Sequence, residues 1–160
     1  LLNDVSQLVC DVNMLRYHVL KKNNMSHVWI IDDDEDDREL FCEIVRDIDA
    51  SIHCLMWSGG EQALKCLRSF SASIPDLIFL DLNMPKMSGL QCLKELKADL
   101  LLNNIPVVMY STGCTVKEMN YALQLGAINY ITKPCSYLKT LLAIQFFINA
   151  YDLTGKPLTS

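Results

Sequence analysis

Short apolar runs alternate with segments of helical pattern along most of this chain, and the alternation limits the folds that it can adopt. Three runs are almost continuously apolar, namely VWII at 28–31, LIFL at 77–80 and PVVMY at 106–110. Strands of this kind are buried on both faces, as in a parallel sheet that helices cover on each side. The sequence therefore predicts an α/β fold with a doubly wound parallel sheet.

Strands and helices are expected to follow one another as five strand–helix units. We expect strands at residues 27–31, 52–57, 77–82, 107–110 and 129–131. We expect helices at residues 35–47, 60–69, 89–98, 116–125 and 136–151. In the first helix, Leu40, Ile44 and Ile48 recur every fourth residue and indicate one apolar face. Gly126 directly follows the fourth helix and is a candidate for its C-cap.

The first part of the chain does not fit this alternation. Residues 1–24 end in a polar, basic stretch, and Met25 opens the run that leads into the first strand. We expect residues 1–24 to be a leader or extension, whether native or added, and residues 25–152 to form the main domain. Residues 153–160 would be a short C-terminal tail. Because so little chain follows the last helix, we expect a domain that stands alone, without an attached output domain.

Charge, hydropathy and cysteine content exclude several classes of protein. The net charge is −5 and the Lys and Arg residues form no block, so direct DNA binding is not expected. No apolar run reaches membrane-spanning length, and no signal peptide is evident. The seven cysteines are odd in number and lack a C-x-x-C pair, so we expect neither a zinc site nor a disulfide framework. These features favour a reducing, cytoplasmic location.

Residues able to do chemistry follow the ends of four expected strands. Asp32 and Asp33 follow the first strand, Asp81 the third, Ser111 the fourth and Lys133 the fifth. Open parallel sheets bind ligands at the carboxyl ends of their strands, so these side chains should converge. Converging carboxylates repel one another and require a cation, and their hard oxygen atoms suit Mg²⁺. A carboxylate in this setting can remain ionised and act as a nucleophile toward a phosphoryl group.

Six consecutive acidic residues, Asp32 to Asp37, divide into two groups. Asp32 and Asp33 lie at the strand end and are expected to face the site. Asp34 is placed to N-cap the following helix, and the three acids after it would occupy the first helical turn and complement the helix dipole. We therefore expect the last four acids, Asp37 included, to form a solvated helix start.

At these positions the sequence resembles the response regulator receiver domain of two-component signalling. The segments IIDDDEDDREL, LIFLDLNMPKMSGL, IPVVMYST and GAINYITKP match the four signature regions of that family in order and spacing. The resemblance extends over about residues 26–150. It implies a CheY-like, flavodoxin-like (βα)5 fold whose five-stranded parallel sheet has the strand order 2-1-3-4-5.

The resemblance also implies a phosphoacceptor and a set of metal ligands. Asp81 would accept a phosphoryl group from phosphohistidine. Asp33 and Asp81 would bind Mg²⁺ directly, Asp32 would act through water, and the backbone carbonyl of Asn83 would complete the protein ligands.

Four further residues receive roles from the same resemblance. Ser111 would donate a hydrogen bond to the phosphoryl group, and Lys133 would pair with it. Tyr130 would be an aromatic switch that turns inward when Ser111 moves. Pro134 would have a structural role, because the peptide bond before this proline is commonly cis in the family and would aim Lys133 into the site.

The expected function is a phosphorylation-controlled signalling switch that catalyses only its own phosphorylation and dephosphorylation. A sensor histidine kinase or a histidine phosphotransfer protein would supply the phosphoryl group, and output would pass through another protein or a phosphorelay. One alternative is a phosphatase of the haloacid dehalogenase type, but that family needs a second Asp where this chain has Asn83. Another is a receiver that has lost phosphorylation and only docks, although the acceptor, metal and lysine positions are intact.

The last expected helix, with the sequence YLKTLLAIQFFINAY, has more apolar side chains than one buried face needs. We expect its core face to consist of Leu138, Leu141, Leu142 and Ile148. The surplus residues are Ile144, Phe146, Phe147 and Tyr151. Surplus exposed apolar area marks contact sites, so we expect the face built from the fourth helix, the fifth strand and the last helix to bind a partner or a second copy.

Overall fold

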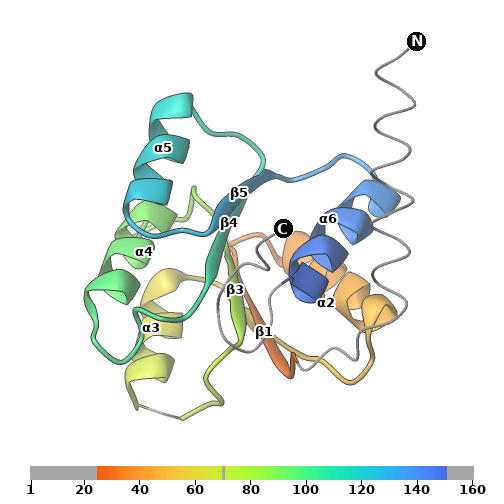
Figure 1. Cartoon of the computed structure of the whole chain (residues 1–160), viewed down its shortest axis with the longest axis horizontal. Coiled ribbons are helices and arrows are strands. Elements are labelled where there is room, and N and C mark those ends of the chain that lie inside the picture. The colour runs from red at the N-terminus through yellow and green to blue at the C-terminus, as the bar shows by residue number, and fades with distance from the viewer. Residues whose placement is uncertain (1–24, 70, 151–160) are drawn as a thin grey trace.

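The computed structural model describes residues 25–69 and 71–150, which form a parallel sheet with helices on both faces (Figure 1). The elements in chain order are β1 (His27–Ile31), α2 (Glu35–Ile48), β2 (His53–Trp57), α3 (Gly60–Ser69), β3 (Leu77–Leu80), α4 (Gly89–Ala98), β4 (Val107–Ser111), α5 (Val116–Gln124), β5 (Asn129–Thr132) and α6 (Tyr137–Ala150). The strand order β2-β1-β3-β4-β5 confirms the predicted 2-1-3-4-5. The predicted boundaries agree to within a residue or two, except that the predicted end of the last helix lies outside the described residues.

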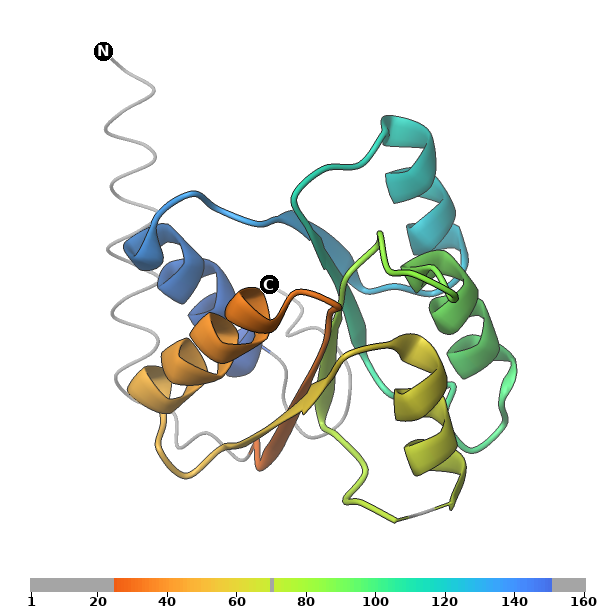
Figure 2. The same cartoon turned by 180° about the vertical axis from the view of Figure 1, so that it is seen from behind.

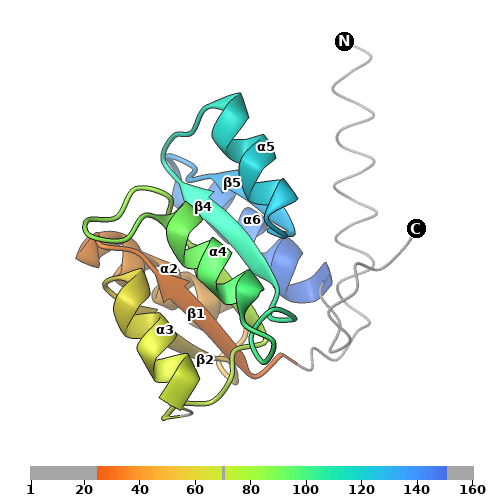
Figure 3. The same ribbon diagram turned by 90° about the vertical axis from the view of Figure 1, so that its left-hand side faces the viewer.

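The helices divide unequally between the two faces of the sheet. Helices α2 and α6 pack side by side on one face, and α3, α4 and α5 cover the other (Figures 1 and 2). Figure 3 shows the α3, α4 and α5 layer in front of the sheet. Because every strand pairing is parallel, the carboxyl ends of all the strands in this sheet lie along the same edge.

The central strands form the core, as their continuous apolar runs predict. Every residue of β3 and β4 is buried, whereas β2 and β5 at the edges of the sheet are partly exposed. Successive side chains of β1 point to opposite faces. Trp29 and Ile31 pack into the core beneath α3, α4 and α5, while Val28 and Ile30 pack beneath α2 and α6.

The apolar face of α2 differs slightly from the prediction. Phe41, Ile44 and Val45 are buried, but Leu40 is 39% exposed. Residues four apart drift around an α-helix by about 40° per step. A row that starts at Leu40 therefore does not follow the core, and the buried stripe begins one residue later.

The predicted core face of α6 is partly wrong. The buried residues are Thr140, Ile144, Phe147 and Ile148, of which only Ile148 was assigned to that face. Leu138 is 64% exposed and Leu142 is 49% exposed. A helix that is apolar on nearly every side carries no pattern that identifies its buried face. Among the described helices, α6 included, none is both long and apolar enough to cross a membrane.

Capping interactions fix the starts of α4 and α5. Ser88 and Gln91 form a capping box at the start of α4, and Thr115 and Glu118 form another at the start of α5. The C-cap of α5 is Leu125, one residue before the predicted candidate Gly126, and Gly126 follows it with a φ of +102°, a conformation that favours glycine. The two capping boxes anchor the loops that follow β3 and β4.

Cys42 on α2 and Cys54 on β2 form a disulfide, which corrects the expectation of no disulfide framework. Their Cα atoms lie 5.6 Å apart, within the range that a disulfide requires. The pairing depends on how α2 packs against β2, which cysteine number and local spacing do not encode. The other described cysteines are free, namely Cys66, Cys92, Cys114 and Cys135.

Loss of this disulfide is expected to lower the free energy of unfolding. For two cysteines 12 residues apart, the chain-entropy model gives about 3 kcal/mol. In urea titrations the wild type should unfold at a lower midpoint when dithiothreitol is present, and Cys54→Ser should unfold at one midpoint with or without it. Equal wild-type midpoints in both conditions would show that the disulfide does not stabilise the fold.

Candidate functional site

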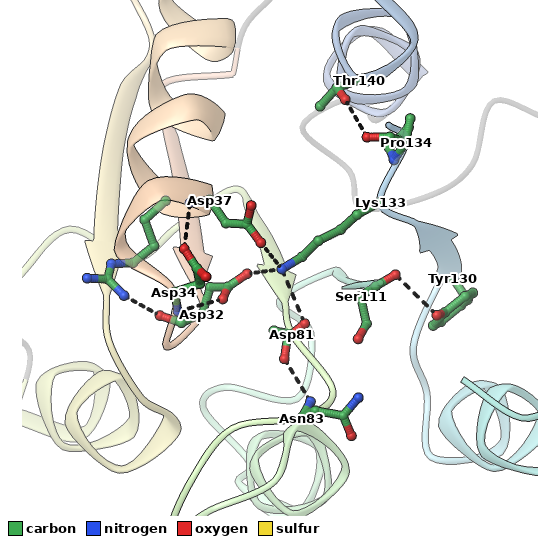
Figure 4. A network of polar contacts seen from close by, with 11 residues as sticks. Asp32, Asp34, Asp37, Asp81, Asn83, Ser111, Tyr130, Lys133, Pro134 and Thr140 are labelled. Carbon is green, nitrogen blue, oxygen red and sulfur yellow. Dashed lines mark hydrogen bonds and ion pairs between the residues drawn. The ribbon is translucent and has the colours of Figure 1, made fainter. Parts of the chain in front are cut away.

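The predicted site residues gather at the carboxyl edge of the sheet (Figure 4). Asp32 directly follows β1, Asp81 follows β3, Ser111 ends β4 and Lys133 follows β5. Leu80, the last residue of β3, pairs with Met109, two residues before the end of β4, so the ends of these neighbouring strands lie close together. The strand-end argument therefore placed these four residues correctly.

Three carboxylates form a compact cluster at this edge. Oxygen atoms of Asp32, Asp33 and Asp81 all lie within 4.8 Å of one another. Asp32 and Asp81 are buried, whereas Asp33 is exposed. Buried carboxylates at this spacing repel unless a cation compensates them. Two buried donors and one open to solvent fit a divalent cation that keeps part of its water shell.

Asp32 is held by groups from several elements. Its backbone N–H donates to the carbonyl oxygen of Trp57 at the end of β2, and its own carbonyl oxygen accepts from Arg38 Nη1 at 2.7 Å. Its Oδ1 accepts from the backbone N–H of Asp34 at 3.0 Å. Burial raises the pKa of Asp32 above its ordinary value, although the hydrogen bonds from Lys133 and Asp34 act in the opposite direction.

Asp81 is positioned by the backbone around it. Its N–H donates to the carbonyl oxygen of Ile31, and its Oδ2 accepts from the backbone N–H of Asn83 at 2.7 Å. The N–H of Gly89, the first residue of α4, donates to Leu82 in the same loop. A Cβ atom at position 89 would collide with the main-chain carbonyl of Asp81, so glycine allows α4 to begin directly against the loop. Asn83 lies beside Asp81, and the role of its carbonyl as a ligand stays a prediction.

Ser111 contributes a buried hydroxyl that has no partner. Its side chain is fully buried, and its Oγ makes no hydrogen bond to any described residue. A buried polar atom without a partner normally costs free energy of about 1–3 kcal/mol. A ligand oxygen at this edge of the sheet would supply the acceptor that this hydroxyl lacks.

Lys133 reaches across the sheet edge into a group of carboxylates. Its Nζ lies 2.6 Å from Asp32 Oδ2, 2.6 Å from Asp37 Oδ2 and 3.5 Å from Asp81 Oδ1. Its side chain is only 9% exposed. Burial lowers the pKa of Lys133, but the hydrogen bonds to Asp32 and Asp37 outweigh burial and raise it above its ordinary value. Lys133 is therefore a fixed positive charge in the site.

The peptide bond before Pro134 is trans, because the described residues contain no cis peptide bond. This corrects the expectation that a cis bond aims Lys133 into the site. The trans form is favoured by about 0.5–1 kcal/mol before proline, and Lys133 reaches its partners without isomerisation. The carbonyl oxygen of Pro134 accepts a hydrogen bond of 3.5 Å from Thr140 Oγ1, which connects the end of β5 to α6.

Tyr130 on β5 is half-buried beside the site. Its hydroxyl donates to the backbone carbonyl of Ser111 over 3.4 Å, so the two residues that the family resemblance links are in contact. Burial raises the pKa of Tyr130 to about 12, and the hydroxyl stays protonated at neutral pH. Whether its ring moves when Ser111 moves stays a prediction.

Asp37 and Tyr110 belong to the site although the sequence reasoning assigned them no role there. Asp37 was expected to be solvated, but its carboxylate contacts Lys133. Side chains in the first turn of a helix point back toward its N-terminus, and the N-terminus of α2 faces the site. The ring of Tyr110, the penultimate residue of β4, lies 5.5 Å from Lys133 Nζ in a cation–π contact.

Comparison with known proteins gives consistent results. The sequence model of the family described as response regulator receiver domain matches residues 28–145. The DNA-binding transcriptional regulator NtrC of Escherichia coli K12 is 27% identical over 130 residues, which cover 81% of this chain and 26% of that protein. Protein-glutamate methylesterase/protein-glutamine glutaminase 3 of Rhodospirillum rubrum is 39% identical over 114 residues, which cover 69% of this chain and 28% of that protein.

A solved structure resembles the fold closely. The phosphorylated cyanobacterial phytochrome response regulator RcpA has a TM-score of 0.72 and 29% sequence identity, and the match covers 77% of this chain and 91% of that one. The two curated relatives are much longer, and this chain spans about a quarter of their length. Their similarity therefore concerns one region of each protein.

Proposed function

This chain belongs to the family of response regulator receiver domains, and on that premise we propose that it is a phosphorylation-controlled switch of two-component signalling. It accepts a phosphoryl group from a histidine kinase on Asp81. The observation that carries the proposal is the convergence of the buried Asp81 with two further carboxylates, the charged Lys133 and the unpartnered Ser111 hydroxyl.

Asp81 acts as the nucleophile in the proposed transfer. An oxygen of its carboxylate attacks phosphorus, and the phosphorus–oxygen bond forms as the phosphorus–nitrogen bond of phosphohistidine breaks. The leaving imidazole takes up a proton. The hydrogen bond from the Asn83 N–H and the nearby charge of Lys133 keep the Asp81 carboxylate in place for this attack.

Ser111 and Lys133 receive the transferred group. The Ser111 hydroxyl donates to a phosphoryl oxygen, which supplies the partner that its Oγ lacks. Lys133 compensates the added negative charge. If Ser111 shifts toward the phosphoryl group, the Tyr130 hydroxyl loses its present acceptor and the ring can turn inward as the switch.

A magnesium ion fits the donor set of this site. Asp32, Asp33 and Asp81, with the backbone carbonyl of Asn83, would hold it, and Asp32 would act through water. When bound, the ion neutralises charge on the phosphoryl oxygens. The family match favours a receiver domain over a phosphatase of the haloacid dehalogenase type. Such a phosphatase would need an acidic residue at position 83, where this chain has Asn83.

Residues 25–152 form the receiver unit in this proposal. The unit acts through contacts with another protein or by passing the phosphoryl group to a histidine phosphotransfer protein. The family match supports a cytoplasmic location, although the Cys42–Cys54 disulfide removes the argument from cysteine content. The unit itself neither contacts DNA nor catalyses the conversion of another substrate.

Uptake of one phosphoryl group from acetyl phosphate tests the proposed function. Wild-type protein incubated with acetyl phosphate and Mg²⁺ should gain the mass of a single phosphoryl group, and excess EDTA should prevent the gain. Circular dichroism confirms that the protein is folded in both samples. A folded protein that gains no mass with Mg²⁺ present would overturn the proposal.

The face built from α5, β5 and α6 is proposed as a contact surface for a second copy. Large apolar side chains are exposed on its helices, namely Val116, Tyr121 and Leu123 on α5 and Leu138, Leu142 and Phe146 on α6.

Beryllofluoride, which mimics the phosphoryl group, should shift the protein from monomer toward dimer in a sedimentation series. Leu138→Ser should weaken that shift, whereas Leu100→Ser, in the exposed loop after α4, should not. A monomer at high concentration with and without the mimic would remove the dimer.

A further inference from the structure

Lys133 is held mainly by carboxylates other than the phosphoacceptor. Its Nζ lies 2.6 Å from both Asp32 and Asp37, but 3.5 Å from Asp81 (Figure 4). The two shorter distances are those of strong charge-assisted hydrogen bonds, and the longest lies beyond ordinary hydrogen-bond range. The resting position of this ammonium group is therefore set by its neighbours.

Asp37 differs in kind from the other partner of Lys133. Asp32 belongs to the cluster of three carboxylates that can hold a cation, and Asp37 does not. Asp37 lies in the first turn of α2, and its side chain is 36% exposed. Its carboxylate instead contacts Lys133, which lies 96 positions away in the sequence. Complementing the helix dipole does not require that contact.

We propose that Asp37 is a positioning residue that competes with the phosphorylated acceptor for Lys133 and thereby restrains phosphorylation. The proposal rests on the proposed function of Asp81. A phosphoryl group on Asp81 brings new anionic oxygens next to Lys133, which then has fewer donors to spare for Asp37. The Asp37 carboxylate also repels the incoming anion. Both effects favour the unphosphorylated state.

The competition must act in both directions. If phosphorylation weakens the pair between Lys133 and Asp37, that pair opposes phosphorylation by the same factor. Asp37 is partly exposed, so solvent screens its charge, and the expected factor is modest at roughly 2- to 5-fold. Lys133 keeps Asp32 as a partner when Asp37 is neutralised, so it should remain charged and in place.

Asp36 offers a matched control for the experiment. It lies in the same helical turn, carries the same charge and is exposed, and its side chain makes no hydrogen bond or ion pair to a described residue. Asp36→Asn and Asp37→Asn remove one negative charge each at adjacent positions. A difference between them reports the contact with Lys133 rather than the general charge of the helix start.

Equilibrium binding of beryllofluoride with Mg²⁺ tests the competition. Tryptophan fluorescence can follow binding, because Trp57 ends β2 and its carbonyl accepts the N–H of Asp32. Asp37→Asn should bind the mimic roughly 2- to 5-fold more tightly than Asp36→Asn. Asp37→Glu restores a carboxylate that can reach Lys133, and should return the affinity to the wild-type value. Circular dichroism checks that every variant is folded.

The outcomes separate this inference from the proposed function. If Asp37→Asn binds the mimic no more tightly than Asp36→Asn, or if Asp37→Glu fails to reverse the gain, the competition is overturned. A wild type that still takes a phosphoryl group from acetyl phosphate would leave the proposed function intact in either case. A wild type that takes none would overturn the proposed function, and the inference would fall with it.

Discussion

Asp81→Asn protein is expected to take up no phosphoryl group from acetyl phosphate under conditions in which the wild type becomes fully phosphorylated. The amide nitrogen and oxygen of asparagine are poor nucleophiles, and no acyl phosphate can form on that side chain. Loss of a covalent nucleophile costs on the order of 10⁶ in rate in a well-measured enzyme. Intact mass measured over time, with and without Mg²⁺, gives the result directly.

The substitution should leave the fold intact. Asparagine has nearly the shape of aspartate, and its Oδ1 can still accept the hydrogen bond that Asn83 N–H donates. Lys133 would lose a carboxylate at 3.5 Å but keep the two at 2.6 Å. Circular dichroism should therefore match the wild type.

Asp36→Asn serves as the control for this experiment, because Asp36 is exposed and lies outside the cluster. It should be phosphorylated at the wild-type rate. Asp32 and Asp33 are the carboxylates beside Asp81, and either could in principle accept a phosphoryl group. If Asp81→Asn gains an acid-stable, base-labile phosphoryl group as fast as the wild type, the acceptor is another residue, and peptide mapping would locate it.

The fold could be predicted from local signals because each of them agrees with the sheet. The continuous apolar runs at β1, β3 and β4 are buried strands, and the helices begin where capping residues such as Asp34 and Thr115 stand. Gly126 follows the C-cap of α5 in a conformation that favours glycine. The fold of such a sequence can be predicted because its local preferences agree with the final packing.

Features that depend on contacts between distant residues were harder to predict from the sequence. The disulfide between Cys42 and Cys54 depends on the distance between a helix and a strand. That distance is known only once the folded structure is known. The buried face of α6 could not be chosen, since Leu138 and Ile144 are equally apolar and only packing decides which is exposed. Hydrophobicity identified the helix but not its orientation.

The site also contains some residues that the sequence predicts and others that it does not. The rule that ligands bind at the carboxyl ends of parallel strands is enough to bring together Asp32, Asp81, Ser111 and Lys133. It gives no information about Asp37, because an acidic residue in a first helical turn already has a sufficient local explanation. Its contact with Lys133 appears only when β5 and α2 are placed in space.

Asp33→Asn is expected to weaken Mg²⁺ binding by at least about 10- to 100-fold, which is the typical cost of removing only an outer-shell partner of a metal site. Asp33 is the exposed member of the three-carboxylate cluster, so the change should hardly affect folding. Fluorescence titration with Mg²⁺ measures the affinity. Phosphorylation by acetyl phosphate should become slow at low Mg²⁺ and recover as the Mg²⁺ concentration rises.

Asp34→Asn is the matched control for this metal prediction. It removes the same charge from the next residue, and asparagine is as good an N-cap as aspartate, so the bond to Asp37 N–H can persist. Its Mg²⁺ affinity should stay close to that of the wild type, because Asp34 is not a member of the cluster. If Asp33→Asn and Asp34→Asn bind Mg²⁺ equally well, the long-range field of the acidic run rather than direct ligation by Asp33 attracts the ion. If only Asp33→Asn loses affinity, and added Mg²⁺ restores its phosphorylation, Asp33 is a ligand.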